Sequence, residues 1–247
     1  MSLLSLKQIS KTFANGTRAL GQLDLSVARG EFISLLGPSG CGKSTALRLI
    51  AGLDQTDSGS LTWNEARPDI GFVFQDPTLM PWTNVFDNVY LPLRLKGVTR
   101  TEATPKIMDV LTRVGLRDFA QSFPRELSGG MKMRASIARA LVLRPALLLM
   151  DEPFAALDEI TRLKLNRDLL ELQAELGMTV IFVTHSVYES AYLSSRICVF
   201  SHRPGRIIES IDVGPSGPRD DAFRLTSAYL ETCQRASTAL QNAMERA

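Results

Sequence analysis

Apolar residues follow two patterns along this chain: alternation with polar residues near the N-terminus, and short continuous runs farther on. Near the N-terminus, LDLSV at residues 23–27 alternates apolar and polar positions, which predicts a half-exposed strand. LLSLKQI and SLTW also have strand character, so we expect a small antiparallel sheet. From residue 31 onward, short apolar runs alternate with helical stretches, as buried parallel strands and their crossover helices do. These runs are FISLL, IGFVF, ALLLM, TVIFV and RICVF.

The middle of the chain has helical periodicity. IMDVLTRVGL places four apolar residues on one helical face: Ile107, Val110, Leu111 and Val114. We therefore expect a helical subdomain at about residues 90–130, inserted into the α/β part. A terminal helix is expected after the Pro/Gly break GPSGPRD.

A glycine-rich segment follows the run FISLL. Here Gly37-x-x-x-x-Gly42-Lys43-Ser44 stands between an expected strand and the helical stretch TALRLIAGL, which is the P-loop pattern in its proper context. The glycines let backbone N–H groups turn inward around a phosphate. Lys43 would neutralise the β- and γ-phosphates, and the Ser44 hydroxyl would ligate Mg²⁺. The expected nucleotide-binding residues are Gly37, Pro38, Ser39, Gly40, Cys41, Gly42, Lys43, Ser44 and Thr45.

The expected fold class is α/β, with a P-loop NTPase core of mostly parallel strands. It would form one domain over residues 1–247, with an N-terminal antiparallel β subdomain and an inserted helical subdomain. The expected parts are about 1–30 and 55–68 for the antiparallel β subdomain, 31–54, 69–89 and 131–213 for the core, about 90–130 for the helical subdomain, and 214–247 for a helical tail.

Acidic residues and a histidine follow two of the apolar runs. Asp151 and Glu152 directly follow the apolar run in ALLLMDEP. In doubly wound sheets, ligands bind at the carboxyl ends of the strands. Asp151 is suited to the Mg²⁺ shell, and Glu152 to orienting or deprotonating the attacking water. His185 follows TVIFV in the same way, so we expect it to reach the γ-phosphate, whereas His202 in SHRPG is expected to be incidental.

Cys41 lies within the P-loop, close to the start of the expected helix. A thiol at a helix N-terminus can have a lowered pKa. We expect no catalytic role for Cys41, but we expect bound nucleotide to block its alkylation.

A second glycine-rich segment lies in ELSGGMKMRASIARAL. Ser128, Gly129 and Gly130 precede a helical stretch, and backbone N–H groups at such an entry attract an anion. By itself, Ser-Gly-Gly is equally a simple helix cap.

In their order along the chain, these motifs resemble those of ATP-binding cassette ATPases. The match spans about residues 5–210. It rests on GPSGCGKST, Gln75, LSGGM, LLLMDEP, ALD at 156–158 and His185. The resemblance implies ATP and Mg²⁺ as cofactors, and a head-to-tail homodimer in which Ser128, Gly129 and Gly130 meet the ATP held by the P-loop of another copy.

Further roles follow by match to that family. Phe13 falls where an aromatic ring stacks on adenine, where the family more often has tyrosine; the alternative is a core phenylalanine. Gln75 would contact Mg²⁺ and water as a catalytic and metal-binding residue, and Asp158 would lie at the dimer seam. Met131 stands where the family usually has glutamine and Ser186 where it often has aspartate; neither change removes a phosphate ligand.

The segment QDPTLMPWTNVFDNVYLPL begins at Gln75. Its aromatics Trp82, Phe86 and Tyr90 could pack in the core or line a groove for a partner's helix. With LSGGM and DEPFAALDEITR, the segment resembles ATPases of the nitrate/sulfonate/taurine-type importers. This implies a membrane permease docking near Gln75–Tyr90, a substrate-binding protein beyond it, and a small, often anionic nutrient such as nitrate, a sulfonate, taurine or a pyrimidine precursor.

Composition narrows the alternatives. The formal net charge of +2 over 247 residues gives no strongly basic surface, so no nucleic-acid partner is expected. Three cysteines without metal-like spacing favour a reduced compartment, and the apolar runs are far shorter than the ~20 residues that span a bilayer. We expect a peripheral protein on the cytoplasmic face of the inner (plasma) membrane. A cassette ATPase acting as a scaffold or assembly factor, and a structural module that holds ATP unhydrolysed, remain alternatives.

Overall fold

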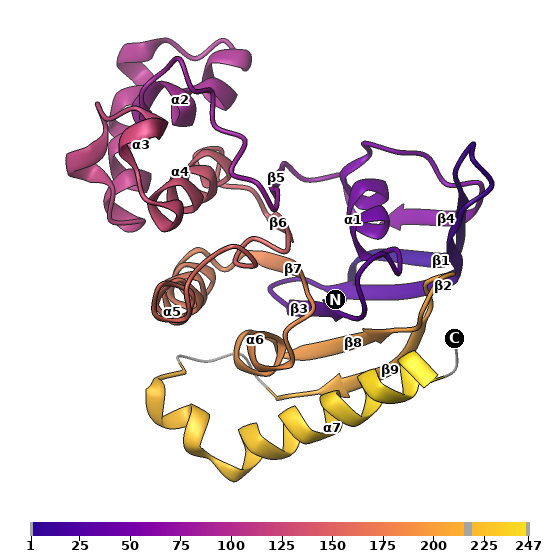
Figure 1. The fold of residues 1–247 in the computed structure, drawn as a ribbon. Coiled ribbons are helices and arrows are strands. Elements are labelled where there is room, and N and C mark those ends of the chain that lie inside the picture. Colours follow the sequence, from indigo (N-terminus) through magenta and orange to yellow (C-terminus); the bar gives the residue numbers. More distant parts are fainter. Residues whose placement is uncertain (1, 215–218, 246–247) are drawn as a thin grey trace.

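Two sheets and a separate group of helices make up the chain in the computed structural model, which describes residues 2–214 and 219–245 (Figure 1). The smaller sheet lies at one side, the larger sheet runs through the middle, and the helical group lies beyond the β5–β6 edge of the larger sheet, on the side away from the smaller sheet (Figure 1). This arrangement confirms the expected α/β class, with its antiparallel part and its inserted helices.

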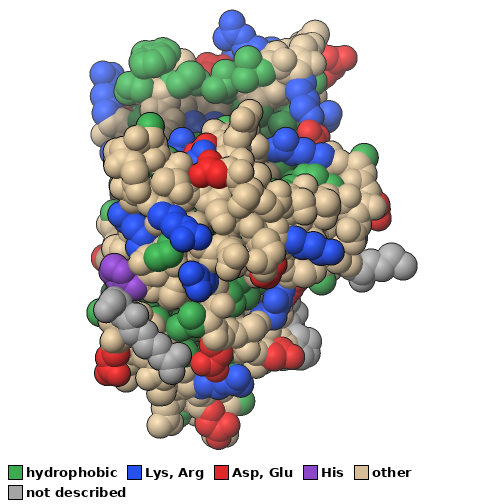
Figure 2. All heavy atoms as spheres, turned by 90° about the vertical axis from the view of Figure 1, so that its right-hand side faces the viewer, with side chains coloured by type: hydrophobic (Ala, Val, Ile, Leu, Met, Phe, Trp, Pro, Cys, Tyr) green, Lys and Arg blue, Asp and Glu red, His purple; other side chains and the backbone are tan. Residues whose placement is uncertain are grey.

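The smaller sheet is antiparallel and has the strand order β2-β1-β4. In β2, Leu23, Leu25 and Val27 are buried and the residues between them are exposed, as the alternating pattern predicted. Lys and Arg side chains are interspersed with Asp and Glu on the molecular face that this sheet helps to form (Figure 2). The strands are β1 (Ser2–Thr12), β2 (Arg18–Ala28) and β4 (Ser58–Trp63).

The larger sheet has six strands in the order β5-β6-β7-β3-β8-β9. All neighbouring pairs are parallel except β8 with β9, which is antiparallel. The five predicted apolar runs form its parallel strands, whereas the edge strand β9 was not predicted. The strands are β3 (Phe32–Leu36), β5 (Ile70–Val73), β6 (Leu147–Asp151), β7 (Thr179–Thr184), β8 (Arg196–Phe200) and β9 (Ile207–Asp212).

The helical group contains the predicted amphipathic helix. Thr99 and Glu102 close a capping box at the start of α3, and Ile107, Val110 and Leu111 are buried along one face. The helix that begins at the second glycine-rich segment, α4, packs against both α2 and α3. The group therefore extends on both sides of residues 90–130: it comprises α2 (Val85–Leu95), α3 (Arg100–Arg113), α4 (Gly129–Leu141) and two 3₁₀ turns (Arg117–Phe119 and Pro124–Glu126).

The remaining helices cover the larger sheet. The expected terminal helix is present as α7, but most of the preceding GPSGPRD segment lies outside the described residues. None of the described helices is long and apolar enough to cross a membrane. These helices are α1 (Lys43–Ala51), α5 (Glu159–Leu176), α6 (Val187–Leu193) and α7 (Ser227–Glu245), with a 3₁₀ turn at Asp221–Leu225.

The central strand β3 separates two apolar cores. Phe32 and Leu36 belong to the core shared with the helical group, α5, α6 and α7. Ile33 and Leu35 belong to the core shared with the antiparallel sheet and α1. Because β3 is buried on both faces, the polar residues that follow it lie at its carboxyl end. The parallel neighbours β6 and β7 end at the same edge of the sheet.

Candidate nucleotide site

The P-loop joins β3 to α1 and is tightly enclosed. Gly42 has φ 107°, and a Cβ at this position would lie 2.5 Å from the Ala19 carbonyl oxygen. A Cβ at Gly37 would lie 2.9 Å from the Phe200 Cβ. Side chains are therefore excluded at both glycines of the motif, and the loop is held close to its neighbours.

Lys43 begins α1, and its side chain is 3% exposed. Its ammonium group donates to the carbonyl oxygens of Gly37 (2.7 Å) and Pro38 (2.8 Å). The same nitrogen lies 4.0 Å from the Glu152 carboxylate. The cation is thus fixed inside the curve of the loop, at the position from which a P-loop lysine meets phosphate.

Ser44 and Asp151 meet across the end of β6. The Ser44 hydroxyl donates to Asp151 Oδ1 at 2.8 Å. Burial raises the pKa of Asp151, and the neighbouring charge of Glu152 acts in the same direction. A hydroxyl oxygen and a carboxylate oxygen this close, at the end of a buried strand, are ligands that a hard cation such as Mg²⁺ prefers.

Glu152 and His185 form a pair at the ends of β6 and β7. His185 Nδ1 lies 3.1 Å from Glu152 Oε2. Glu152 adopts φ 45°, a left-handed conformation that is uncommon for a residue with a Cβ and costs roughly 1–3 kcal/mol. Its backbone N–H donates to the Val183 carbonyl (3.0 Å), which ties the strained residue to β7. The tertiary structure thus maintains an acid–histidine pair beside Lys43.

Cys41 does not have the lowered pKa that a thiol at a helix N-terminus can have. Cys41 is 1% exposed, and burial raises the pKa of its thiol even though Lys43 lies close by. Desolvation of the thiolate outweighs the favourable charge because the side chain packs into the core behind the loop.

Two further predicted residues lie outside this cluster. Phe13 lies in the turn after β1 and is 40% exposed, with the Lys11 ammonium 5.9 Å from its ring centroid. Gln75 is exposed in the loop that follows β5. Among the described residues, no hydrogen bond or ion pair joins either of them to Lys43 or Glu152.

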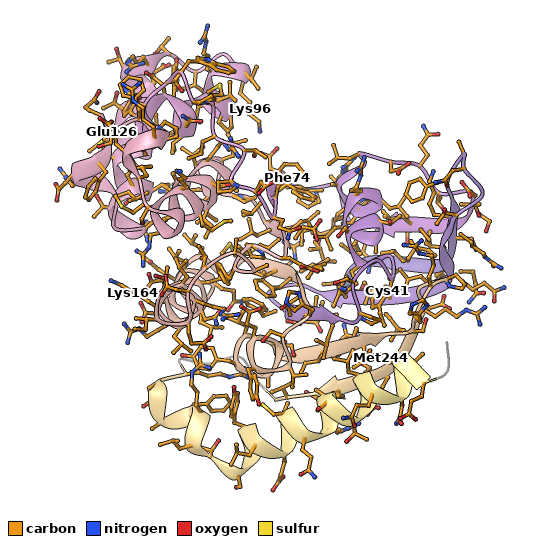
Figure 3. The ribbon with its side chains drawn as sticks, viewed as in Figure 1. Cys41, Phe74, Lys96, Glu126, Lys164 and Met244 are labelled. Carbon is orange, nitrogen blue, oxygen red and sulfur yellow. The ribbon has the colours of Figure 1, made fainter. Side chains whose placement is uncertain are left out.

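The second glycine-rich segment belongs to the helical group. Ser128 caps α4 by accepting a hydrogen bond from the Met131 N–H (3.3 Å), and Asp158 caps α5 in the same way through Thr161. Glu126, just before this cap, lies in the helical group, well away from Cys41 of the P-loop (Figure 3). The structure therefore does not bring Ser128, Gly129 and Gly130 to the P-loop of the same chain.

The two departures from the family pattern have structural roles. Met131 packs against the main core and supplies the N–H that Ser128 accepts. Ser186 caps α6 by accepting from the Glu189 N–H at 3.3 Å. Serine therefore performs the capping that an aspartate at this position could also perform.

Two arginines that the sequence analysis did not single out contact the site's loops. Arg203 donates from Nε (3.0 Å) and Nη2 (2.6 Å) to the Gly40 carbonyl. Arg139, on α4, donates to the carbonyls of Pro77 (2.9 Å) and Thr78 (2.8 Å), just beyond Gln75. Neither arginine belongs to a recognisable motif, so only the fold could reveal these contacts.

This arrangement defines a P-loop nucleotide-binding protein of the α/β class. A protein-family model described as ABC transporter matches residues 20–155. The aliphatic sulfonates import ATP-binding protein SsuB 1 of Pseudomonas syringae pv. syringae is 44% identical over 221 residues, covering 89% of each chain. The spermidine/putrescine import ATP-binding protein PotA of Nitrosomonas europaea is 46% identical over 210 residues, which cover 81% of this chain and 58% of that protein.

A solved structure of an ATP-binding cassette is also similar to this chain. It is the dimeric post-hydrolysis state of the ATP-binding cassette MJ0796 bound to ADP and Pi, which superposes with a TM-score of 0.76 and 33% identity over 85% of this chain and 98% of that one. The chain belongs to the ABC transporter family. It is an ATPase whose hydrolysis of ATP serves transport, as the resemblance of its motifs implied.

Proposed function

We propose that this chain is the ATP-hydrolysing subunit of a membrane importer for a small anionic nutrient. The observation that carries the proposal is the Lys43–Glu152–His185 cluster at the carboxyl ends of β3, β6 and β7. The import function is supported by SsuB 1 and PotA, both named import ATP-binding proteins. Those names favour transport over the scaffold or assembly-factor alternative.

The cluster assigns a step to each residue. Lys43, held by two loop carbonyls, presents its charge to the β- and γ-phosphates as the P–O bond breaks. Glu152 accepts a proton from the attacking water. His185 positions the Glu152 carboxylate through Nδ1, and its second ring nitrogen would contact the γ-phosphate. Ser44, Asp151 and Gln75 would hold Mg²⁺, which supplies charge neutralisation for the phosphates.

The signature segment gives a reason for dimerisation. Ser128, Gly129 and Gly130 offer N–H groups at the start of α4 but lie away from the P-loop of their own chain. We infer a head-to-tail homodimer in which each signature meets the ATP of the partner, with Phe13 against adenine and Asp158 at the seam. The dimeric MJ0796 structure supports this arrangement.

The surface after Gln75 would meet the permease. Phe86 is buried and Tyr90 half-buried, so core packing accounts for these two aromatics, whereas Trp82 is 74% exposed. Hydrophobic side chains gather at the end of the molecule where the helical group lies (Figure 2). Arg139 links the loop beyond Gln75 to α4, so closure at the signature can move this surface. We propose that the subunit is a peripheral protein at the cytoplasmic face of the membrane.

The cargo is tested in the assembled transporter. We would co-purify the chain with its permease, reconstitute both in proteoliposomes with the substrate-binding protein, and measure phosphate release with sulfonates, nitrate, taurine, pyrimidine precursors or polyamines. Stimulation by an anion, lost with Glu152→Gln, is the expected result. Stimulation by polyamines alone would overturn the anionic cargo, and ATP hydrolysis that no membrane protein alters would overturn the transport role.

A further inference from the structure

A hollow of about 700 Å³ lies on the side of His185 that faces the C-terminal helix. Its walls come from α5, from the junction between β7 and α6, and from α7. The volume is within the range of small-molecule sites, roughly 300–1,000 Å³. The lining residues are Arg162, His185, Ser186, Val187, Tyr188, Cys233, Gln234, Ser237, Thr238 and Gln241.

One face of α7 supplies the polar wall of this hollow. Gln234, Ser237, Thr238 and Gln241 recur at helical spacing, so they project toward the same side. Their amides and hydroxyls are neutral groups that can donate hydrogen bonds. None of the described lining residues is Asp or Glu, so the hollow itself presents donors without a fixed negative charge.

Arg162 provides positive charge at this hollow. Its Nη2 contacts Glu159 on the same helix, whereas its Nε is buried and has no hydrogen-bond partner. A guanidinium carries five N–H donors, and a buried donor without an acceptor is costly. A movement of Arg162 toward an acceptor in the hollow would therefore gain a hydrogen bond.

Three carboxylates lie close to the hollow, and two of them are paired with a basic side chain. Glu159 pairs with Arg162, and Glu152 pairs with His185. Glu189, buried on α6 and accepting from Thr184, interacts electrostatically with both Arg162 and His185. Burial raises the pKa of Glu189, and its other carboxylate oxygen, Oε1, is buried without a hydrogen-bond partner.

We propose that this hollow is a binding site for a small organic anion of the sulfonate or carboxylate class, and that its occupancy restrains His185. Arg162 and the α7 amides and hydroxyls would bind the anionic head, while Val187, Tyr188 and Cys233 offer apolar surface to a short organic tail. Binding would slow hydrolysis without competing for the P-loop. This inhibitory consequence rests on the proposed role of His185, whereas the binding itself does not.

Binding is tested by titration calorimetry with ethanesulfonate, propionate and inorganic sulfate. Lys43→Ala serves as the background, because it removes the P-loop lysine as a competing anion site. We expect ethanesulfonate or propionate to bind one per chain and more tightly than sulfate, which lacks an apolar tail.

The α7 wall allows a matched pair of variants. Gln241→Leu combined with Thr238→Val removes two polar groups from the hollow while keeping side-chain size, and should weaken binding roughly tenfold or more. Asn242→Leu changes the adjacent exposed amide, which does not line the hollow, and should leave binding unchanged. Absence of binding, equal effects of both changes, or sulfate alone binding would overturn the proposal.

The inhibitory effect is tested by measuring ATP hydrolysis at saturating Mg-ATP, with the chain in which Lys43 and His185 are intact. Ethanesulfonate should lower kcat without raising KM for ATP, and the Gln241→Leu/Thr238→Val chain should resist it. Inhibition that disappears as ATP rises would place the anion at the P-loop and overturn the proposal. A chain that binds the anion but never hydrolyses ATP would contradict the proposed function while leaving the binding site standing.

Discussion

The two glycine-rich segments of this chain differ in the functional groups that surround them. The P-loop follows β3, the strand that separates the two cores, and its Lys43 and Ser44 lie beside Glu152 and Asp151. His185 in turn pairs with Glu152. The signature begins a helix at the molecular surface, with a serine cap. No hydrogen bond or ion pair within the described residues joins it to a catalytic side chain. The same element, a glycine-rich helix entry, is thus surrounded by functional groups in one place and, in the dimer proposed above, would be half of a site in the other.

The glycines show the same contrast. At Gly42 the backbone of Ala19 excludes a side chain, and φ is positive. At Gly129, the nearest atom to an added Cβ is Leu157 Cδ2 at 3.5 Å, an ordinary contact. Gly130 is more restricted, since a Cβ there would lie 2.6 Å from Thr161 Cγ2. The P-loop glycine is therefore required by the fold of its own chain, whereas Gly129 is not.

The largest effect should come from Glu152→Gln. The amide keeps the shape and can still meet His185, but it cannot accept a proton from water. ATP hydrolysis should fall by about 10²–10⁴-fold, with ATP binding retained. Phosphate release and nucleotide binding measure the two effects separately. Unchanged hydrolysis would show that Glu152 is not the base.

The second prediction separates the half-site from the complete one. In the Glu152→Gln background, mass in solution should show a dimer with Mg-ATP and a monomer with ADP. Ser128→Arg should abolish the dimer while each chain still binds ATP, because the arginine blocks the N–H groups at the start of α4. Lys106→Glu, an exposed charge change on α3, is the control. A dimer that persists in Ser128→Arg would mean that the segment is only a helix cap.

The third prediction compares the glycines directly. Gly42→Ala should lower the free energy of unfolding by about 2–4 kcal/mol, through its positive φ and the clash with Ala19. Gly129→Ala should raise it by about 0.5–1 kcal/mol, because alanine favours the helix and meets ordinary contact distances. Urea denaturation of both chains checks the comparison, and equal changes would contradict it.

The smallest effect concerns Cys41. Its buried thiol has a raised pKa, so the reactive thiolate is scarce at neutral pH, and alkylation of the native protein should still be increasing with pH above about 8.5. Mass spectrometry of the labelled peptide, with and without ATP and against the unfolded chain, measures this. Rapid labelling at pH 7 would show that the back of the P-loop is open.

Local patterns predicted much of the fold. The apolar runs identified the five parallel strands because strands buried on both faces require uninterrupted apolar residues. Strand β9 escaped prediction because IIESID is an edge strand with alternating burial. The extent of the helical group was missed because α4 joins it through packing on α2 and α3, which sequence spacing does not show.

The candidate site divides in the same way. The sequence identified Lys43 through the P-loop motif, and Glu152 and His185 because each stands at the end of an apolar run. It could not show that Glu152 takes a left-handed conformation, or that Arg203 and Arg139 contact its loops. These contacts join segments far apart in the chain, and single-chain periodicity carries no information about them.

The sequence alone determined the class of chemistry, because a P-loop, two carboxylates and a histidine at strand ends are residue types that phosphate hydrolysis requires at fixed local spacing. Only the tertiary structure decided which of these groups meet. It closed Lys43, Glu152 and His185 into one cluster, raised the pKa of Cys41 by burial, and kept Ser128 on a helical group away from the P-loop of its own chain. The physical reason is that packing sets the distances between remote segments and the desolvation of their side chains, and these decide which functional groups surround a glycine-rich turn.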